Sequence, residues 1–206
     1  MSFYNDRVYP YLINAWGNPA PIRKIRERLI PPAKGIVLEI GFGTGANLIH
    51  YNPARITKLY ALEPNPGMIR FAEQKLRESR LSVEFLDLPG EQIPLPDEAV
   101  ETVISTFTLC TIPGIAEAVQ GIRRVLKPNG RLIFFELGLS PDLRVQRWQK
   151  LWEPIFQRLF GGLYLTRDIP ALLTAYGGFQ IDQMESGYLA KFPKSWTYSW
   201  WGSARL

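Results

Sequence analysis

A glycine-rich segment that follows a short apolar run is the part of this sequence best suited to hold a ligand. Glu39 is followed by Gly41, Gly43 and Gly45 at alternate positions, just before a helical pattern. Glycine lets the backbone approach a bound group closely, and free N–H groups at a helix start favour negative charge. Alternating glycines also weaken a helix start, so a turn without a ligand is the less favoured interpretation. The spacing therefore predicts a binding loop.

An acidic residue follows this loop at the distance typical of ribose recognition. Glu63 lies 22 residues beyond Gly41, at the end of the next expected strand. A carboxylate there can accept hydrogen bonds from both ribose hydroxyls. Read from Gly41 to Ala46, the loop fits the dinucleotide pattern of nicotinamide-dependent enzymes. Read from Glu39 to Gly45, it equally fits the loop that binds S-adenosylmethionine (SAM), so both cofactors stay open on these residues.

The elements that must position these residues alternate along the first two thirds of the chain. Short apolar runs predict strands, and apolar residues at helical spacing predict helices between them. Such alternation is typical of βαβ units, which give a parallel sheet with helices on both faces. Strands are expected over 35–40, 59–62, 81–86, 101–105 and 131–136, and helices over 20–30, 45–51, from 65 onward and over 115–126.

The pattern changes after Glu136. A helix is expected from Ser140, with Pro154 kinking or splitting it, and another from Thr166 to Ala175. Strands are expected over 179–185 and 196–204, and the link between them is too short for a parallel crossover. We therefore predict an α/β fold with a doubly wound, seven-stranded, mostly parallel, Rossmann-like sheet whose last strand is antiparallel.

Composition excludes several classes of protein and site. The chain has 206 residues, of which 46% are hydrophobic and 21% charged, as expected for a soluble globular protein. One cysteine, Cys110, and one histidine, His50, argue against a disulfide framework and a metal site. No apolar run is long enough to span a membrane and no secretory signal is visible, so a cytoplasmic location is expected.

The charge of the chain is mildly basic, with a formal net charge of +5. Its densest basic cluster, Arg23, Lys24, Arg26 and Arg28, is interpreted as the solvated face of a helix. No nucleic-acid-binding pattern is present, so no nucleic-acid partner is expected. A weak peripheral contact with anionic lipid stays open.

Further segments accompany the loop and carry a resemblance to a known family. Together with the loop they resemble the class I SAM-dependent methyltransferases, and the match narrows to the small bacterial relatives of the animal alkyl-thiol methyltransferases. The wider match rests on Glu63-Pro64-Asn65-Pro66, Gly90-Glu91, Thr108-Leu109-Cys110 and residues 124–130, and the narrower one on Phe3-Tyr4, Gly45-Ala46-Asn47-Leu48, Phe134 to Glu136, Gly161-Gly162 and residues 165–169.

The resemblance implies a cofactor site made of residues that follow the strands. SAM would be the cofactor, S-adenosylhomocysteine (SAH) the product, and no metal would be needed. The implied residues are Glu39, Gly41, Gly43 and Gly45 for the methionine and ribose end, Glu63 for the ribose hydroxyls, Asn65 and Met68 flanking the adenine, Gly90 and Glu91 at its edge, and Thr106 beside the methionine amino group and the sulfonium.

The acceptor is expected to be a small hydrophobic molecule. A thiol is favoured, because it ionises easily and needs little help from a base, whereas an amine, phenol, quinone or phospholipid is left open. Glu136 and Tyr164 are the candidate bases. The chain is expected to be a single domain, 1–206, with an N-terminal lid over 1–30 and a helical insertion over 138–165 that covers the acceptor.

Two other functions are consistent with the residues. One is an NAD(P)-dependent oxidoreductase, because the glycine loop also fits that cofactor. The other is a protein that binds SAM without transferring its methyl group. The oligomeric state is left open.

Overall fold

A seven-stranded sheet forms the centre of the protein, with the order β3-β2-β1-β4-β5-β7-β6. The computed structural model describes residues 9–16, 18–189 and 192–206. Neighbouring strands are parallel except at β7, which is antiparallel to both β5 and β6. The predicted mostly parallel sheet with an antiparallel last strand is therefore confirmed. The strands are β1 Gly35–Ile40, β2 Ile56–Leu62, β3 Val83–Leu86, β4 Val100–Thr106, β5 Leu126–Leu137, β6 Gln180–Tyr188 and β7 Tyr198–Arg205.

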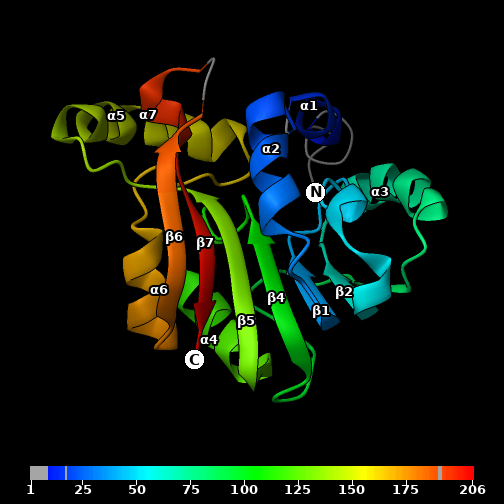
Figure 1. Cartoon of the computed structure of the whole chain (residues 1–206). Coiled ribbons are helices and arrows are strands. Elements are labelled where there is room, and N and C mark those ends of the chain that lie inside the picture. The colour runs from blue at the N-terminus through cyan, green and yellow to red at the C-terminus, as the bar shows by residue number, and fades with distance from the viewer. Residues whose placement is uncertain (1–8, 17, 190–191) are drawn as a thin grey trace.

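Helices cover both faces of this sheet (Figure 1). Helix α2 crosses one face and α4 lies behind the other. Each face has its own apolar cluster, one built around Val119 and Ile122 of α4 and the other around Ile30 and Ala72. The helices are α1 Tyr9–Trp16, α2 Ala20–Leu29, α3 Pro66–Glu78, α4 Ile115–Val125, α5 Leu143–Leu159, α6 Ile169–Gly177 and α7 Lys194–Thr197, with short 3-10 helices η2 Leu48–His50 and η3 Pro53–Arg55.

The two antiparallel strands complete the sheet with long, regular pairing. Residues of β7 pair with β5 from Ala204 opposite Leu132 to Ser199 opposite Leu137. In its described residues, the link between β6 and β7 contains the short helix α7. This link reverses the chain direction without a crossover helix, as its length predicts.

The helix expected over 45–51 is wrong. The segment is a series of turns that ends in the short 3-10 helix η2. Gly45 has a φ of +70°, outside the α-helical region, and the side chains of Asn47 and Tyr51 bond to other parts of the chain. Side-chain hydrogen bonds to Glu39 of β1 thus accompany the turns that stand in place of a regular helix.

Two expected helix boundaries also differ. Pro154 does not split its helix, because α5 runs unbroken from Leu143 to Leu159. The helix expected from Thr166 begins instead at Ile169, where the Asp168 side chain accepts from the Ala171 N–H as N-cap. The N–H and hydroxyl of Thr166 bond to Glu153 of α5 instead.

The carboxyl ends of the parallel strands share one edge of the sheet. In Figure 1 the arrowheads of β4 and β5 point towards the end of the molecule where α1, α5 and α7 lie. In open α/β sheets, ligands bind at this edge, where the strand order reverses. Here the order reverses between β1 and β4. Within the described part of the chain, no helix has the length and apolar character that a membrane crossing requires.

Candidate functional site

The glycine loop connects β1 to η2 in a conformation that only glycine adopts easily. Gly41, Gly43 and Gly45 have φ values of +67°, +57° and +70°. A Cβ atom at Gly41 would collide with the Thr108 side chain. A Cβ atom at Gly43 would meet no atom closer than 3.8 Å, so the backbone there is open to a neighbouring group. The loop thus has the form of a cradle.

Glu63 closes the base of this cradle from the end of β2. Its carboxylate accepts from the Gly43 N–H at 2.8 Å and from the Asn65 N–H at 3.0 Å. The side chain is buried, and burial raises its pKa against the effect of these two hydrogen bonds. Asp87, directly after β3, raises it further through its charge. Each oxygen keeps a lone pair for a second donor.

Glu39, the last but one residue of β1, is held in a network of hydrogen bonds. It accepts from Asn47 Nδ2 at 2.8 Å and from the Tyr51 hydroxyl at 2.6 Å. The carboxylate is fully buried, and this burial raises the pKa of Glu39 to about 7. The carboxyl group is therefore poised to change its charge near neutral pH, and a nearby cation favours its ionised form.

Arg26 of α2 reaches the same network and corrects one expectation. Its side chain is buried and donates from Nη1 to Asn47 Oδ1 at 2.6 Å. The cluster in which it lies was expected to be solvated, and this expectation is wrong for Arg26, while Arg23, Lys24 and Arg28 are exposed. Burial lowers the pKa of Arg26 to about 10, so it remains a cation at neutral pH. Its Nε has no hydrogen-bond partner among the described residues.

Asn47 joins these groups to the end of β4. Its Nδ2 also donates to the Thr106 hydroxyl at 3.1 Å. Glu39, Thr106 and Arg26 thus meet around one amide, which sequence reasoning missed. Asn47 lies in the segment from Gly45 to Leu48 that carries part of the family resemblance, and its polar side chain and that of Tyr51 in an expected helix were a further signal. This network combines a carboxylate and a guanidinium, the groups that suit an amino acid's ammonium and carboxylate.

The expected adenine-side residues lie on two segments. The Asn65 side chain caps α3 by accepting from Gly67 N–H at 2.8 Å, and Met68 is buried in the first turn. Gly90 packs closely on Ile112, whose side chain a Cβ atom would strike. Glu91 accepts from the Gly114 N–H at 3.1 Å.

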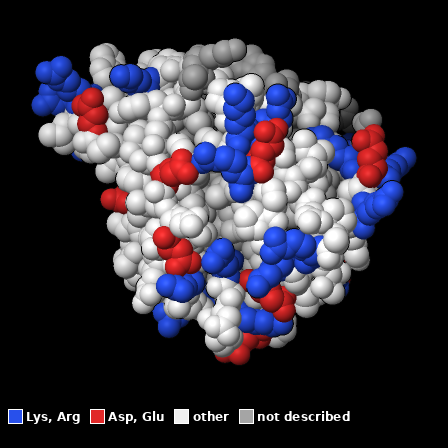
Figure 2. Space-filling view, in the orientation of Figure 1, with Lys and Arg blue, Asp and Glu red and all other residues white. Residues whose placement is uncertain are grey.

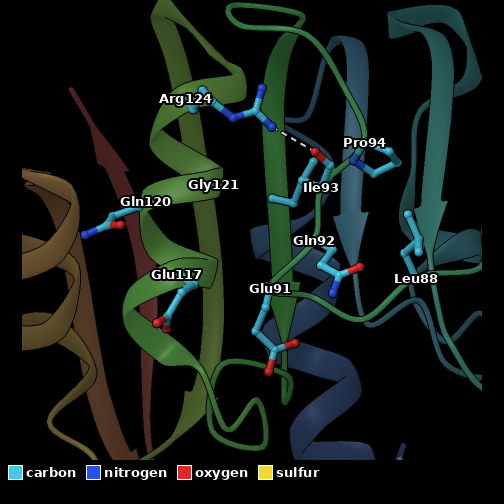
Figure 3. A pocket seen from close by; sticks show the side chains of 9 residues that line it. All are labelled: Leu88, Glu91, Gln92, Ile93, Pro94, Glu117, Gln120, Gly121 and Arg124. Carbon is cyan, nitrogen blue, oxygen red and sulfur yellow. Dashed lines mark hydrogen bonds between the residues drawn. The ribbon is translucent and has the colours of Figure 1, made fainter.

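Glu91 also lines an open groove between the 88–94 loop and α4 (Figure 3). The groove has a volume of about 550 Å³. Arg124 closes one end by donating to the backbone oxygens of Ile93 and Leu95 at 2.8 and 2.6 Å. Glu91 is its only residue that was expected to bind the cofactor, so the groove is separate from the glycine loop.

Glu136 lies in a second buried network at the end of β5. Its carboxylate accepts from the Ser105 hydroxyl at 2.6 Å and from the backbone N–H groups of Cys110 and Thr108 at 3.1 and 3.2 Å. Burial raises its pKa, and these donors oppose that rise. Burial also raises the pKa of the Cys110 thiol beside it. Glu136 therefore holds the 107–110 loop in position.

Tyr164 also contacts the 107–110 loop. Its N–H donates to the Cys110 oxygen at 2.8 Å. The Arg167 guanidinium lies 3.8 Å from the centre of its ring, a distance typical of a cation–π contact. Arg167 also donates to the Leu109 oxygen. Tyr164 and Glu136 thus contact neighbouring parts of one loop.

An apolar cluster surrounds the 107–110 loop at the strand ends. Its buried members come from this loop, from α5 and from the segment after α5: Cys110, Phe156, Leu163 and Leu165. Trp152 and Trp196 pack edge to face, with ring centres 5.4 Å apart, and join α5 to α7. Phe107 has a φ of +56°, a strained backbone conformation for a large side chain and one that is often found at functional sites. This apolar cluster is suited to contact an apolar acceptor.

The N-terminal lid lies partly outside the described residues. Residues 1–8 and 17, which include Phe3 and Tyr4, are not described. The Tyr11 ring is mostly exposed and packs edge-on against Phe71 of α3. Within the described ranges, no cluster of His, Cys, Asp and Glu could hold a metal ion.

Comparisons with known proteins agree with this geometry. Residues 38–134 match the model of a family described as a methyltransferase domain. Thiol S-methyltransferase TMT1B of Homo sapiens is 34% identical over 176 residues, which are 78% of this chain and 70% of that protein. Thiol S-methyltransferase TMT1A of Homo sapiens is 33% identical over 149 residues, 70% of this chain and 60% of that protein.

The fold is also found among solved structures. A SAM-dependent methyltransferase from Leishmania major superposes with a TM-score of 0.69 at 14% identity, over 98% of this chain and 80% of that one. At this identity the likeness concerns the fold alone. It agrees with the Rossmann-like architecture of the sheet and its covering helices.

Proposed function

Because this chain belongs to the class I SAM-dependent methyltransferases, we propose that it transfers the methyl group of SAM to a small hydrophobic thiol. The observation that carries the choice of a thiol is that the carboxylate of Glu136 is buried and occupied by hydrogen bonds. This carboxylate is fully buried and already accepts from several donors of the protein. An acceptor that ionises without a base therefore suits the site. The similarity to two thiol S-methyltransferases supports the same choice.

The residues around the glycine loop suit SAM. Gly41, Gly43 and Gly45 allow close backbone approach, and the lone pairs of Glu63 suit ribose hydroxyls. The unpartnered Nε of the buried Arg26 suits the methionine carboxylate. Glu39 and Thr106 suit the methionine ammonium, and Asn65, Met68, Gly90 and Glu91 are proposed for the adenine side. SAM supplies an activated methyl group when bound.

The reaction that follows needs only alignment and dehydration of the nucleophile. The thiol loses its proton to solvent, the resulting thiolate sulfur forms a bond to the methyl carbon, and the bond from that carbon to the sulfonium sulfur breaks. The products are a methyl thioether, SAH and a proton. In this proposal Glu136 is a positioning residue, because it orients the 107–110 loop, and Tyr164 supports the same loop.

The pH dependence of the rate tests whether the thiol ionises by itself. We expect kcat/KM for a series of thiols to rise with pH around the pKa of each thiol in solution, because only the thiolate reacts. The measurement is initial SAH formation across pH for thiophenols and alkyl thiols of different pKa. A rise at the same pH for every thiol would indicate an enzyme base and contradict the proposal. Glu136→Gln should leave the position of the rise unchanged.

The nicotinamide-dependent interpretation of the sequence gains no support. The relatives reported above are all named as methyltransferases, and none is a nicotinamide-dependent enzyme. A thiol differs from the other acceptors left open, an amine, phenol, quinone or phospholipid, because it ionises readily without a base. The same pH series, run with a phenol and an amine, shows whether either of these two is accepted in place of a thiol.

A further inference from the structure

Helix α5 exposes a row of large apolar side chains to solvent. Trp148, Leu151 and Ile155 are 56%, 63% and 45% exposed. They are spaced by three and four residues, so they share one side of the helix. Val145 and Phe156 lie on the adjoining side of the helix and are buried against the protein.

A row of basic side chains runs beside this apolar row. Arg147 and Lys150 each precede one member of it in the sequence, and Arg158 continues the row in the last turn. All three are exposed, and within the described residues none of them forms an ion pair. Figure 2 shows basic side chains at the corner of the molecule where Figure 1 draws α5. We call these six residues, Trp148, Leu151, Ile155, Arg147, Lys150 and Arg158, the outer face of α5.

Acidic residues hardly offset this charge. Glu153 is the only acidic residue within α5, and its carboxylate accepts from the N–H and hydroxyl of Thr166 at 2.8 and 2.7 Å. Asp142 is occupied as the N-cap, where it accepts from the Arg144 N–H. The outer face therefore combines apolar side chains with cationic ones that have no ion-pair partner in the described part of the chain.

We propose that the outer face of α5 docks on the surface of an anionic lipid bilayer. A helix with tryptophan and leucine beside a basic row lies flat in the headgroup region, with its apolar side chains inserted and its basic ones at the phosphates. Anionic lipid attracts each basic residue near the surface. A symmetric contact with a second copy would instead bring two basic rows together, which opposes association.

The position of α5 gives this surface a function. The helix lies at the carboxyl edge of the sheet and contributes Phe156 and Trp152 to the apolar cluster around Cys110. A protein docked through α5 would hold the acceptor side of the site close to the membrane, where apolar molecules concentrate. Lipid binding itself needs neither cofactor nor acceptor, so the inference stands independently of the proposed function.

The N-terminal basic cluster is less suited to the same role. Arg26 is buried, Arg28 pairs with Glu185 at 2.8 Å, and Arg23 lies 3.6 Å from Glu27. The side of α2 that carries these residues is thus partly neutralised. Contact with lipid, if it were made through α2, would not depend on Trp148 or Leu151.

Co-sedimentation with vesicles tests the proposal on the full chain. Phosphatidylcholine vesicles with and without phosphatidylserine are the probes. We expect binding to the anionic vesicles, weakening as salt is raised, and at least about tenfold weaker binding for Trp148→Ser/Leu151→Ser, because apolar burial supplies part of the affinity. Tyr176→Ser is the matched control, since Tyr176 is an exposed aromatic residue on α6, outside the outer face.

A second variant removes two basic side chains of the outer face and keeps its apolar side chains. Arg147→Gln/Lys150→Gln should lose most of the preference for anionic vesicles while keeping its SAH affinity, which reports that the variant is folded. Absence of vesicle binding by the unaltered protein would overturn the proposal, and so would equal binding by all the variants. A dimer that Trp148→Ser/Leu151→Ser dissociates, without vesicle binding, would assign the face to a second copy and overturn it as well.

Discussion

A single amide side chain organises the charged residues of the site. Asn47 bonds to Arg26, Glu39 and Thr106, which come from α2, β1 and β4. These elements are far apart in the sequence, so the network exists only when the N-terminal helix is docked on the sheet. Changes to these residues should therefore alter recognition of the methionine end of SAM and leave recognition of its nucleoside end intact.

Recognition of the two ends can be measured separately with two ligands, one that carries the methionine group and one that lacks it. SAH carries the methionine group, whereas methylthioadenosine has the same nucleoside and lacks the amino acid. We expect Arg26→Met to weaken SAH binding about 10- to 100-fold and to leave methylthioadenosine affinity nearly unchanged, because a hydrogen bond to a charged group is worth about 1.5–3 kcal/mol. Calorimetric titration with both ligands makes the measurement.

Glu63→Gln is the matched comparison for this pair of titrations. Because its proposed partners are ribose hydroxyls present in both ligands, it should weaken SAH and methylthioadenosine alike, by about 10-fold or more. Equal loss of both ligands in Arg26→Met would mean that Arg26 supports the loop as a whole. Unchanged affinities in Glu63→Gln would remove the ribose from the proposed role of that carboxylate.

Glu39 should make the ligand-free protein less stable as pH rises. Its folded pKa is about 7 against an ordinary value of 4.5, so its protonated form is favoured by folding. The associated stability is fully present below pH 4.5 and is lost as pH rises through 7. Glu39→Gln should therefore raise the free energy of unfolding at pH 8, by roughly 1–3 kcal/mol, and change it much less at about pH 4.5.

Urea unfolding of both proteins at these two pH values checks the sign. The same variant should bind SAH more weakly at pH 8, because it lacks the charge proposed to face the ammonium. A gain in stability of the same size at both pH values would show that the effect does not arise from ionisation of Glu39.

At the scale of elements, the segment between β5 and β6 departs from the alternating βα order. Helix α5 crosses the carboxyl edge and is attached chiefly through Val145, Gln149 and Phe156. Gly161 and Gly162 follow it with φ values of +64° and +88°, a pair that permits large backbone rotation. We infer that residues 140–166 form a lid over the acceptor.

Hydrogen exchange tests the lid. Amides over 140–166 should exchange more slowly when SAH and an alkyl thiol are bound together than in the free protein, because closure buries them against the acceptor. Helix α4 is the internal control, since it packs in the core and should be protected in both states. Equal exchange over 140–166 with and without the ligands would contradict the lid.

At the scale of the whole molecule, the sequence was sufficient for the sheet and insufficient for the polar networks. Apolar runs predicted the strands because continuous burial leaves a clear pattern, as at Val37 and Leu38. The pairing of polar side chains in hydrogen bonds leaves no such pattern in the sequence. Arg26 looked like its exposed neighbours, and Asn47 and Tyr51 were interpreted as parts of a helix, because their partners lie far along the chain.

The glycine loop and Glu63 were recognisable for a different reason. Their spacing reflects two neighbouring parallel strands that end at the same edge of the sheet, an arrangement that many cofactor sites share, so sequence alone indicates it. Side chains on the acceptor side follow no shared spacing. The burial of Glu136 among donors of the 107–110 loop therefore appeared only in the structure.

Methyl transfer from SAM to a thiol is tested most directly by one matched set of acceptors. Thiophenol, phenol and aniline share a ring and differ in the accepting atom. Each is incubated with the enzyme and methyl-labelled SAM, and the products are identified by mass spectrometry. We predict labelled methyl phenyl sulfide, formed together with an equal amount of SAH, and no labelled product from phenol or aniline above the enzyme-free control. Label in anisole or N-methylaniline without label in the sulfide would contradict methyl transfer to a thiol.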